Sequence, residues 1–386
     1  MNFDATKSTL RSLKRRLVNT ILFGVDPPRD CLSTREWVRE NPPAEAHYIP
    51  IDPPHTIKRC PPRTVEATVH SKFTRELLTE VPTSYVAVIP YGRVFGHHGA
   101  IITPDNRLLR DVSIDFGAPQ DRHFALARGN LPKVKKINGK SAVLASKGAR
   151  HYFHWLFDAL PRLDMLQRSG IAVDHYLIPK PKAFHYEYLD LFGIPPKHVI
   201  PLEKDSHAEV EQLILPSLPS RTGVVTRRSC DFLRKTVFKV ITPPVTLSTH
   251  RRLYISRSQA EKRKVLNEDK VIQALESYGF RTIVLEALSV VEQVTAFASA
   301  DIIVAPHGAG LSNLVYCRPG TQVIECFSPQ YVNVCYWGLC EQLKLPYFYI
   351  IGEGPHLPEG TDANQVGTPI SISLQVLDQT LKTLLG

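Results

Sequence analysis

Beyond residue 250, short apolar stretches alternate with segments whose apolar residues recur at helical spacing. Strands that alternate with helices predict right-handed crossovers and a parallel sheet, as in a Rossmann-like domain. Asn267 is a candidate N-cap, and Ser289 and Glu292 have the S-x-x-E spacing of a helix capping box. The predicted strands cover 253–256, 281–285, 302–305, 321–326 and 347–351, and the predicted helices cover 267–278, 289–300, 336–343 and 371–385.

The first half of the chain contains the same kinds of element in a less regular order. Pro104, Asp105 and Asn106 lie between two apolar stretches and predict a hairpin turn. Apolar residues at 151–166 have helical spacing, and Pro161 should kink that helix or split it in two. The predicted strands cover 84–89, 100–103, 107–112, 141–145, 175–178 and 212–215, and a further predicted helix covers 186–192.

The length of 386 residues exceeds the roughly 250–300 residues at which single cores stop growing, so two domains are expected. Proline is frequent at 26–65, which predicts an extended arm, because proline cannot join a central strand. We predict a basic helix and Pro-rich arm over 1–80, a Rossmann-like domain over 81–225, and a second such domain over 226–386.

The composition adds a basic balance. Lys and Arg number 47 against 37 Asp and Glu, a formal net charge of +10. Such a charge suggests an anionic partner, which includes nucleic acid, phosphorylated small molecules and acidic membrane surfaces. No helix-turn-helix, RNA-recognition or zinc pattern accompanies the charge, which disfavours nucleic acid. The seven cysteines include no C-x-x-C pair, so neither a disulfide framework nor a zinc ribbon is indicated, and a reduced, cytoplasmic chain is expected.

The N-terminal residues leave two interpretations open. No stretch approaches the roughly 20 apolar residues needed to span a bilayer. The start of the chain is basic, with Arg11, Lys14, Arg15 and Arg16 before a short apolar patch. A helix of this kind can contact the inner face of an acidic membrane. A solvated surface helix explains the same residues.

A turn of small residues follows the apolar stretch 302–305 and precedes a short helical segment. In a parallel sheet the loop after a strand faces the ligand crevice. Small residues let the backbone approach an anion, and the N–H groups and dipole of the next helix favour phosphate. A tight turn without a ligand has the same pattern. The candidate residues of this loop are His307, Gly308, Ala309, Gly310, Leu311 and Asn313.

Two arginines and a glutamate adjoin the predicted strand ends. Arg257 follows the stretch 253–256 and should lie in the same crevice as the small-residue loop. Arg257 and Arg263 suit a diphosphate, because the guanidinium group binds phosphate oxygens in pairs; a solvated run of charges is the alternative. Glu325 ends the stretch 321–326, where it can accept hydrogen bonds from ribose hydroxyls or form an ion pair with the arginines.

His154 and Asp158 are four residues apart, so on a helix they share a face. A carboxylate beside an imidazole is a candidate general base. His151 precedes His154 by three residues, so a metal site is an alternative, although a third clear ligand is missing. A histidine that is simply satisfied within the core is a further alternative.

Three blocks of sequence together resemble glycosyltransferase family 61, which includes plant cell-wall xylosyl- and arabinosyltransferases and eukaryotic O-linked N-acetylglucosaminyltransferases. They span about 140–328, roughly half of the chain, and their shared order and spacing are more specific than any single block. The blocks are His154-Trp-Leu-Phe-Asp158 with Pro161-Arg162, Tyr254-Ile-Ser-Arg257 with Arg263 and Asn267, and 307–313 with 320–325 behind it.

The resemblance implies a GT-B architecture, an α/β fold of two Rossmann-like domains with parallel sheets that face across a cleft. It also implies transfer of a sugar from a nucleotide donor with inversion, the C-terminal domain holding the donor. Arg257 and the loop 307–311 would hold the diphosphate. Asn313 and Glu325 would support the loop and the nucleoside.

The resemblance places His154 and Asp158 at the cleft, one of them as the base on the acceptor hydroxyl. The arginines and the helix N-terminus would neutralise the leaving phosphate without a metal, in keeping with a sequence that has no D-x-D motif. We therefore expect no metal cofactor, a nucleotide-sugar donor with a UDP-sugar favoured, and a polysaccharide, lipid-linked glycan or protein acceptor. The alternatives are a phosphate-binding or metal-dependent hydrolase that uses His151 and His154, and a basic nucleic-acid-binding protein.

Overall fold

The computed structural model describes residues 24–41, 47–115, 123–242, 251–355 and 367–385. The chain forms two compact units, each assembled from three segments. The larger part of the second unit is one continuous segment, which begins close to the boundary expected near 225. The first unit comprises Met1–Pro53, Thr83–Tyr186 and Ile194–Pro219, and the second comprises Pro54–Pro82, Glu187–Gly193 and Ser220–Gly386.

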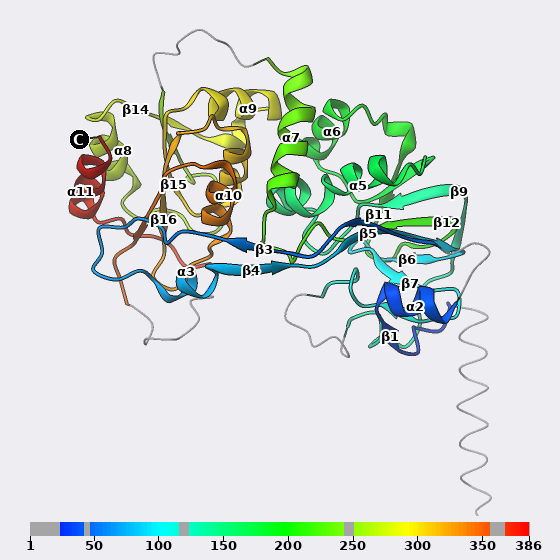
Figure 1. Cartoon of the computed structure of the whole chain (residues 1–386). Helices are drawn as coiled ribbons and strands as arrows, with labels where there is room; N and C mark the ends of the chain where they lie inside the picture. Colours follow the sequence, from blue (N-terminus) through cyan, green and yellow to red (C-terminus); the bar gives the residue numbers. More distant parts are fainter. Residues whose placement is uncertain (1–23, 42–46, 116–122, 243–250, 356–366, 386) are drawn as a thin grey trace, which may run out of the picture. The chain divides into compact units, whose positions relative to one another are not determined.

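The second unit is built on a parallel sheet of five strands in the order β14-β13-β15-β16-β17 (Figure 1). From β13 the chain first adds β14 on one side and then adds β15, β16 and β17 on the other side. This is the flavodoxin-like strand order. Such sheets bind ligands beyond the carboxyl ends of the strands where the order reverses, which here is between β13 and β15. The main elements are α7 (Arg227–Val240), β13 (Arg252–Ile255), α8 (Glu268–Glu276), β14 (Phe280–Ile283), η4 (Leu285–Ala287), α9 (Val290–Ser299), β15 (Ile302–Pro306), η5 (Ala309–Tyr316), β16 (Gln322–Phe327), α10 (Cys335–Leu343), β17 (Tyr347–Ile351) and α11 (Leu374–Leu385).

The sheet of the second unit has an apolar layer on each face. Tyr254, Val304 and Ile324 pack in one layer with residues of α8 and α11, and Figure 1 shows these two helices together on one side of the sheet. Side chains alternate along a strand, so Glu325 points to the opposite face, which α9 and α10 cover. A carboxylate is therefore directed into the interior of the unit.

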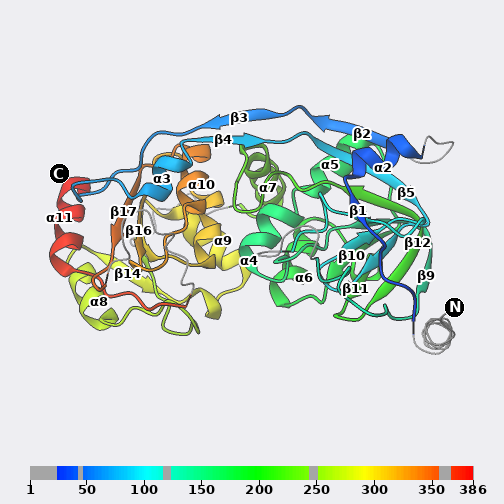
Figure 2. The same ribbon diagram turned by 90° about the horizontal axis from the view of Figure 1, so that it is seen from below.

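Residues 54–82 add a two-stranded ribbon to the second unit (Figure 2). β3 (His55–Lys58) pairs antiparallel with β4 (Leu78–Val81), and α3 (Ser71–Arg75) lies between them in the chain. Phe73 of α3 is fully buried, with its ring centroid 5.4 Å from that of Trp337 and 4.6 Å from that of Tyr349. These aromatic contacts fix the ribbon to the unit.

The first unit contains a ten-stranded mixed sheet. β9 to β12 run parallel to their neighbours within this group, whereas β5 and β6 run antiparallel to β12. The expected parallel sheet is thus present in only one part of the unit, because β5 to β8 are joined by connections too short for a crossover helix. The elements are β1 (Cys31–Leu32), α2 (Thr34–Glu40), β2 (His47–Asp52), β5 (Ser84–Pro90), β6 (Arg93–Phe95), β7 (Ala100–Ile102), β8 (Leu108–Leu109), β9 (Lys135–Val143), α4 (Tyr152–His154), η2 (Trp155–Ala159), α5 (Arg162–Ser169), β10 (His175–Pro179), α6 (Ala183–Leu191), which continues into the second unit, η3 (Pro196–His198), β11 (Val199–Leu202) and β12 (His207–Pro216).

The Pro-rich stretch 26–65 is more ordered than the extended arm that the sequence predicts. Among the strands that the structure describes, β2 pairs with β5 alone, so Pro50 lies in an edge strand, where a missing N–H group is tolerated. α2 begins with a complete capping box, in which Ser33 and Glu36 each accept a hydrogen bond from the other's backbone N–H. The S-x-x-E spacing could have revealed this helix in the sequence.

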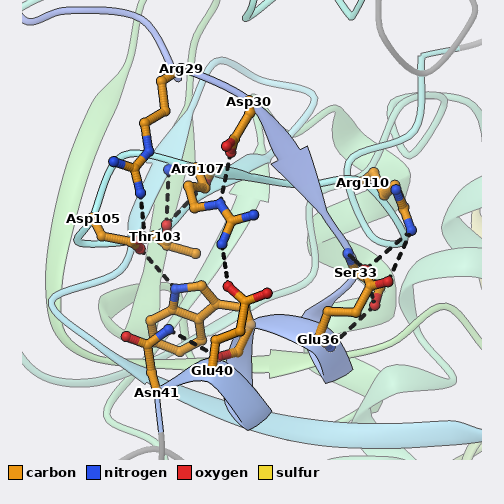
Figure 3. Close-up of polar contacts among 11 residues, drawn as sticks. Arg29, Asp30, Ser33, Glu36, Glu40, Asn41, Thr103, Asp105, Arg107 and Arg110 are labelled. Atoms are coloured by element: carbon orange, nitrogen blue, oxygen red, sulfur yellow. Dashed lines mark hydrogen bonds and ion pairs between the residues drawn. The ribbon is translucent and has the colours of Figure 1, made fainter.

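Polar contacts attach the segment around α2 to the β7–β8 hairpin (Figure 3). Arg107 donates to Asp30 Oδ1 at 2.7 Å and also contacts Glu40. The buried indole N–H of Trp37 donates to Asp105 Oδ1 at 2.8 Å. Exposed ion pairs of this kind contribute about 0–1 kcal/mol each, so the burial of Trp37 is the larger stabilising contribution.

Across the described ranges, no helix combines the length and the apolar character needed to cross a membrane. The basic residues Arg11 to Arg16 lie outside those ranges, and their contact with a membrane surface stays a prediction.

Candidate functional site

The stretch predicted as a kinked helix is divided into α4, the π-helical turn η2 and α5. In η2 the N–H of Leu160 donates to Trp155 O at 2.9 Å, five residues back instead of four. Pro161 has no N–H to continue the ladder, and α5 begins at Arg162. The predicted break at Pro161 is confirmed. The π-helical turn was not expected, and such turns are frequent at functional sites.

His154 and Asp158 form a pair at this turn. His154 Nδ1 lies 2.8 Å from Asp158 Oδ2, and Asp158 is only 3% exposed while His154 is half-buried. With Asp158 as a carboxylate, Nδ1–H donates to it and Nε2 is left to accept a proton. Gly148 precedes α4, and a Cβ there would lie 2.8 Å from the His154 ring. The imidazole is therefore held from two sides, as an oriented general base requires.

His151 is exposed at the N-cap position of α4. Nowhere in the described part of the chain do three or more His, Cys, Asp or Glu side chains gather in a way that could hold a metal ion. The metal-dependent alternative therefore has no ligand set among those residues.

In the second unit, Arg257 and Gly308 meet where the strand order reverses. They follow β13 and β15, which are adjacent parallel strands. A Cβ on Gly308 would lie 1.8 Å from Arg257 Nη1, so the guanidinium rests directly on the loop backbone. Arg257 Nη2 donates to Lys262 O at 2.8 Å, whereas the buried Nε has no hydrogen-bond partner among the described residues. This arrangement places a cation and an unpaired donor at the expected ligand site.

Arg263 brings a second cation to the same place. Its Nε donates to His307 O at 3.0 Å, and its guanidinium lies 5.1 Å from the Tyr331 ring centroid. The φ of Arg263 is +56°, an uncommon left-handed conformation that the surrounding contacts must maintain. Burial lowers the pKa of Arg257, and the charge of Arg263 lowers it further. The two arginines thus share one region of positive potential, suited to an anion.

His307 is buried beside a buried carboxylate. Its Nδ1 contacts Glu325 Oε1, and the hydroxyl of Tyr347 donates to Glu325 Oε2. The imidazole also stacks on Phe327, with 5.3 Å between ring centroids. Burial is the main cause of the lowered pKa of His307.

The structure places Glu325 in the interior of the unit. Glu325 is 0% exposed, and its two carboxylate oxygens contact His307 and Tyr347. Neither of these partners is an arginine, and a hydrogen bond from a ribose hydroxyl stays a prediction. The role of Glu325 in the structure is to orient the imidazole at the start of the loop.

The rest of the loop forms the 3-10 helix η5 instead of an α-helix. Asn313 Nδ2 donates to Gln293 Oε1 at 2.8 Å and to Gly310 O at 3.1 Å. Leu311 is buried, and a Cβ on Gly310 would lie 2.5 Å from Leu285 Cδ1. Ala309, the next residue after Gly308, begins η5. The side chains of Asn313 and Leu311 hold the loop in place. Gly308 is buried against the Arg257 guanidinium, whereas Ala309 and Gly310 are partly exposed.

Sequence reasoning missed several residues around His307. Phe327 is two residues beyond Glu325 on β16, so the period of two along a strand could have placed both on one face. Tyr347 lies on β17, and only the pairing of Val323 with Tyr347 reveals how near it is to Glu325. No sequence signal indicates Tyr331.

Comparisons with known proteins address this part of the chain. A model of the family described as Glycosyltransferase 61 matches residues 152–324. The EGF domain-specific O-linked N-acetylglucosamine transferase of Drosophila melanogaster is 31% identical over 118 residues, which are 28% of this chain and 22% of that protein. The chain therefore aligns with about a fifth of the length of this curated relative. The matched residues include all three motif blocks except Glu325 itself, and the predicted family resemblance is confirmed over them.

Proposed function

Because residues 152–324 match the model of the Glycosyltransferase 61 family, we propose that this chain transfers a sugar from a nucleotide-sugar donor to an acceptor hydroxyl with inversion. A UDP-sugar is the favoured donor. The name of the relative from Drosophila melanogaster suggests N-acetylglucosamine as the first sugar to test and a protein hydroxyl as the first acceptor. Polysaccharide and lipid-linked glycans are the other acceptor classes.

The observation that carries this proposal is the pair of arginines at the reversal point of the second unit's sheet. A diphosphate placed beyond β13 and β15 would meet the guanidinium groups of Arg257 and Arg263. Gly308 has no side chain, and this leaves room for the Arg257 guanidinium on the loop backbone. The two guanidinium groups would neutralise the charge that develops on the leaving phosphate. The proposal therefore needs no metal ion for that task.

The first unit would supply the base. In the proposed step, His154 Nε2 takes the proton of the acceptor hydroxyl as the acceptor oxygen bonds to the anomeric carbon. The bond from that carbon to the diphosphate oxygen breaks on the opposite face, and the nucleoside diphosphate leaves with the electron pair. Asp158 stabilises the imidazolium that forms, through the Nδ1 contact of 2.8 Å. A GT-B arrangement, in which two domains face across a cleft, would bring these groups to one substrate and is part of the proposal.

The test is release of nucleoside diphosphate by the purified chain. UDP-N-acetylglucosamine and a panel of other UDP- and GDP-sugars are supplied with folded protein, polysaccharide or lipid-linked acceptors, with and without EDTA. We expect acceptor-dependent release that EDTA does not change, loss of release in Arg257→Ala, and inverted configuration in the product. Acceptor-independent release at the same rate would instead indicate a hydrolase. Tight binding of duplex DNA without any nucleotide-sugar turnover would favour the nucleic-acid alternative.

A further inference from the structure

Arg162 is a fully buried arginine of the first unit. It is 1% exposed, and its Nη1 donates to Val143 O at 3.2 Å and to Ala145 O at 3.3 Å. Its Nε and Nη2 are buried without a hydrogen-bond partner among the described residues. Burial lowers the pKa of Arg162 to about 10, which leaves the side chain charged at neutral pH. A buried cation with unsatisfied donors is costly, so its presence calls for a compensating charge.

Asp158 is a buried carboxylate four residues earlier in the chain, and its negative charge opposes the lowering of the Arg162 pKa. His154 lies four residues earlier again and contacts Asp158 Oδ2 through Nδ1 at 2.8 Å. Along the α4–η2–α5 stretch, the buried carboxylate thus contacts the imidazole that precedes it, and its charge is opposite to that of the buried guanidinium that follows it.

Arg162 also ties this stretch to the sheet. Its carbonyl partners, Val143 and Ala145, lie at and just beyond the carboxyl end of β9. The chain then continues to Gly148, whose backbone is so close to the His154 ring that a Cβ would lie 2.8 Å away. Arg162 thus also fixes the segment that leads to Gly148. That segment packs against the face of the His154 ring that Gly148 covers.

We propose that Arg162 is a positioning residue for the His154–Asp158 pair, and this proposal rests on the proposed function. The buried positive charge keeps Asp158 directed as an acceptor toward His154 Nδ1, which leaves Nε2 to take the proton of the acceptor hydroxyl. Arg162 acts only through its neighbours, because its own side chain is closed off from any substrate.

The test uses the full chain with 15N-labelled histidine and the variants Arg162→Lys and Arg162→Met. Arg168→Met is the matched control, since Arg168 lies on the same helix and pairs with Asp52 at 2.7 Å, away from the pair. Imidazole 15N shifts report whether Nδ1 of His154 carries the proton, with the signal assigned from His154→Ala. Turnover and the KM for the donor are measured in parallel.

We expect Arg162→Met to lose the Nδ1–H signature of His154 and to lower kcat by roughly tenfold or more, with the donor KM unchanged. Arg162→Lys should retain part of the Nδ1–H signature and part of kcat. Arg168→Met should change neither the signature nor kcat. An unchanged His154 signature in folded Arg162→Met would overturn the proposal. If Arg162→Met does not fold, Asp158→Asn in the same chain should restore folding, and failure to do so would equally count against a charge pair. The NMR readout needs no turnover, so it separates this proposal from failure of the proposed transferase activity.

Discussion

The glycine at position 308 allows a sharp test of the donor site. Gly308 has φ −178° and ψ 166°, an extended conformation that any residue adopts, so Gly308→Ala introduces no backbone strain. The added Cβ would lie 1.8 Å from Nη1 and 2.7 Å from Cζ of Arg257. Because those atoms are the far end of a flexible side chain, we expect the guanidinium to be displaced and the loop to remain in place.

The magnitude follows from the contacts that the displaced guanidinium loses. A hydrogen bond from a charged group contributes about 1.5–3 kcal/mol, which corresponds to donor binding that is roughly 10- to 150-fold weaker. Within the described part of the chain, the Arg257 side chain makes one hydrogen bond, from Nη2 to Lys262 O at 2.8 Å. Its loss should lower the free energy of unfolding by about 1.5–3 kcal/mol. Calorimetric titration with UDP measures the loss of donor affinity, and urea unfolding measures the change in the free energy of unfolding.

Two further variants isolate the cause. Gly367→Ala is the matched control in the same unit, because a Cβ there would meet no atom within 4 Å and its φ is not left-handed; it should bind UDP as the wild type does. Adding Gly308→Ala to Arg257→Ala should weaken binding no further, since the methyl group acts only through the arginine. Wild-type affinity in Gly308→Ala, or additive losses in the double variant, would refute this reasoning.

Three more predictions concern the base, the pH dependence of stability and a helix cap. Asp158→Asn should keep UDP affinity but lower nucleotide release by roughly 10²- to 10⁴-fold; unchanged release would reject the base assignment. Burial lowers the pKa of His185 to about 4, so its stabilising contribution is full above about pH 6.5 and is lost as the pH falls toward 4. His185→Gln should therefore flatten the fall in unfolding free energy between pH 6.5 and 4, by up to roughly 3 kcal/mol, and an unchanged slope in urea unfolding would contradict this. Ser289→Ala should lower the unfolding free energy by about 1 kcal/mol, because it removes the capping box of α9; an unchanged Tm would show that the cap contributes nothing.

Local pattern predicted the second unit better than the first. Its strands alternate with helices, and each strand of the five-stranded sheet lies within a residue or two of its predicted position. The capping box at Ser289 is confirmed. Asn267 occupies the N-cap position of α8 but its side chain makes no capping bond, because it exchanges hydrogen bonds with the backbone of Ile372 instead. A partner more than 100 residues away is outside the reach of a local pattern.

The first unit was harder to predict because its hairpins bring distant segments together. β12 pairs with β5, β6 and β9, and none of these pairings follows from the spacing of apolar residues. In the candidate site, too, some residues could be predicted from local spacing and others could not. The arginines at strand ends and the pair His154–Asp158 could be found from spacing, whereas the contact of Glu325 with Tyr347 depends on sheet order, and the buried state of Arg162 depends on packing against β9.

Calorimetric titration of the wild-type chain and Arg257→Ala with UDP and UMP, in the presence of EDTA, tests the central claim most directly. We predict that UDP binds the wild type with a Kd well below about 1 mM, that UMP binds more weakly because it lacks the second phosphate, and that Arg257→Ala removes this difference. A folded wild-type chain that gives no heat with UDP or with nucleotide sugars at millimolar concentration would contradict the account.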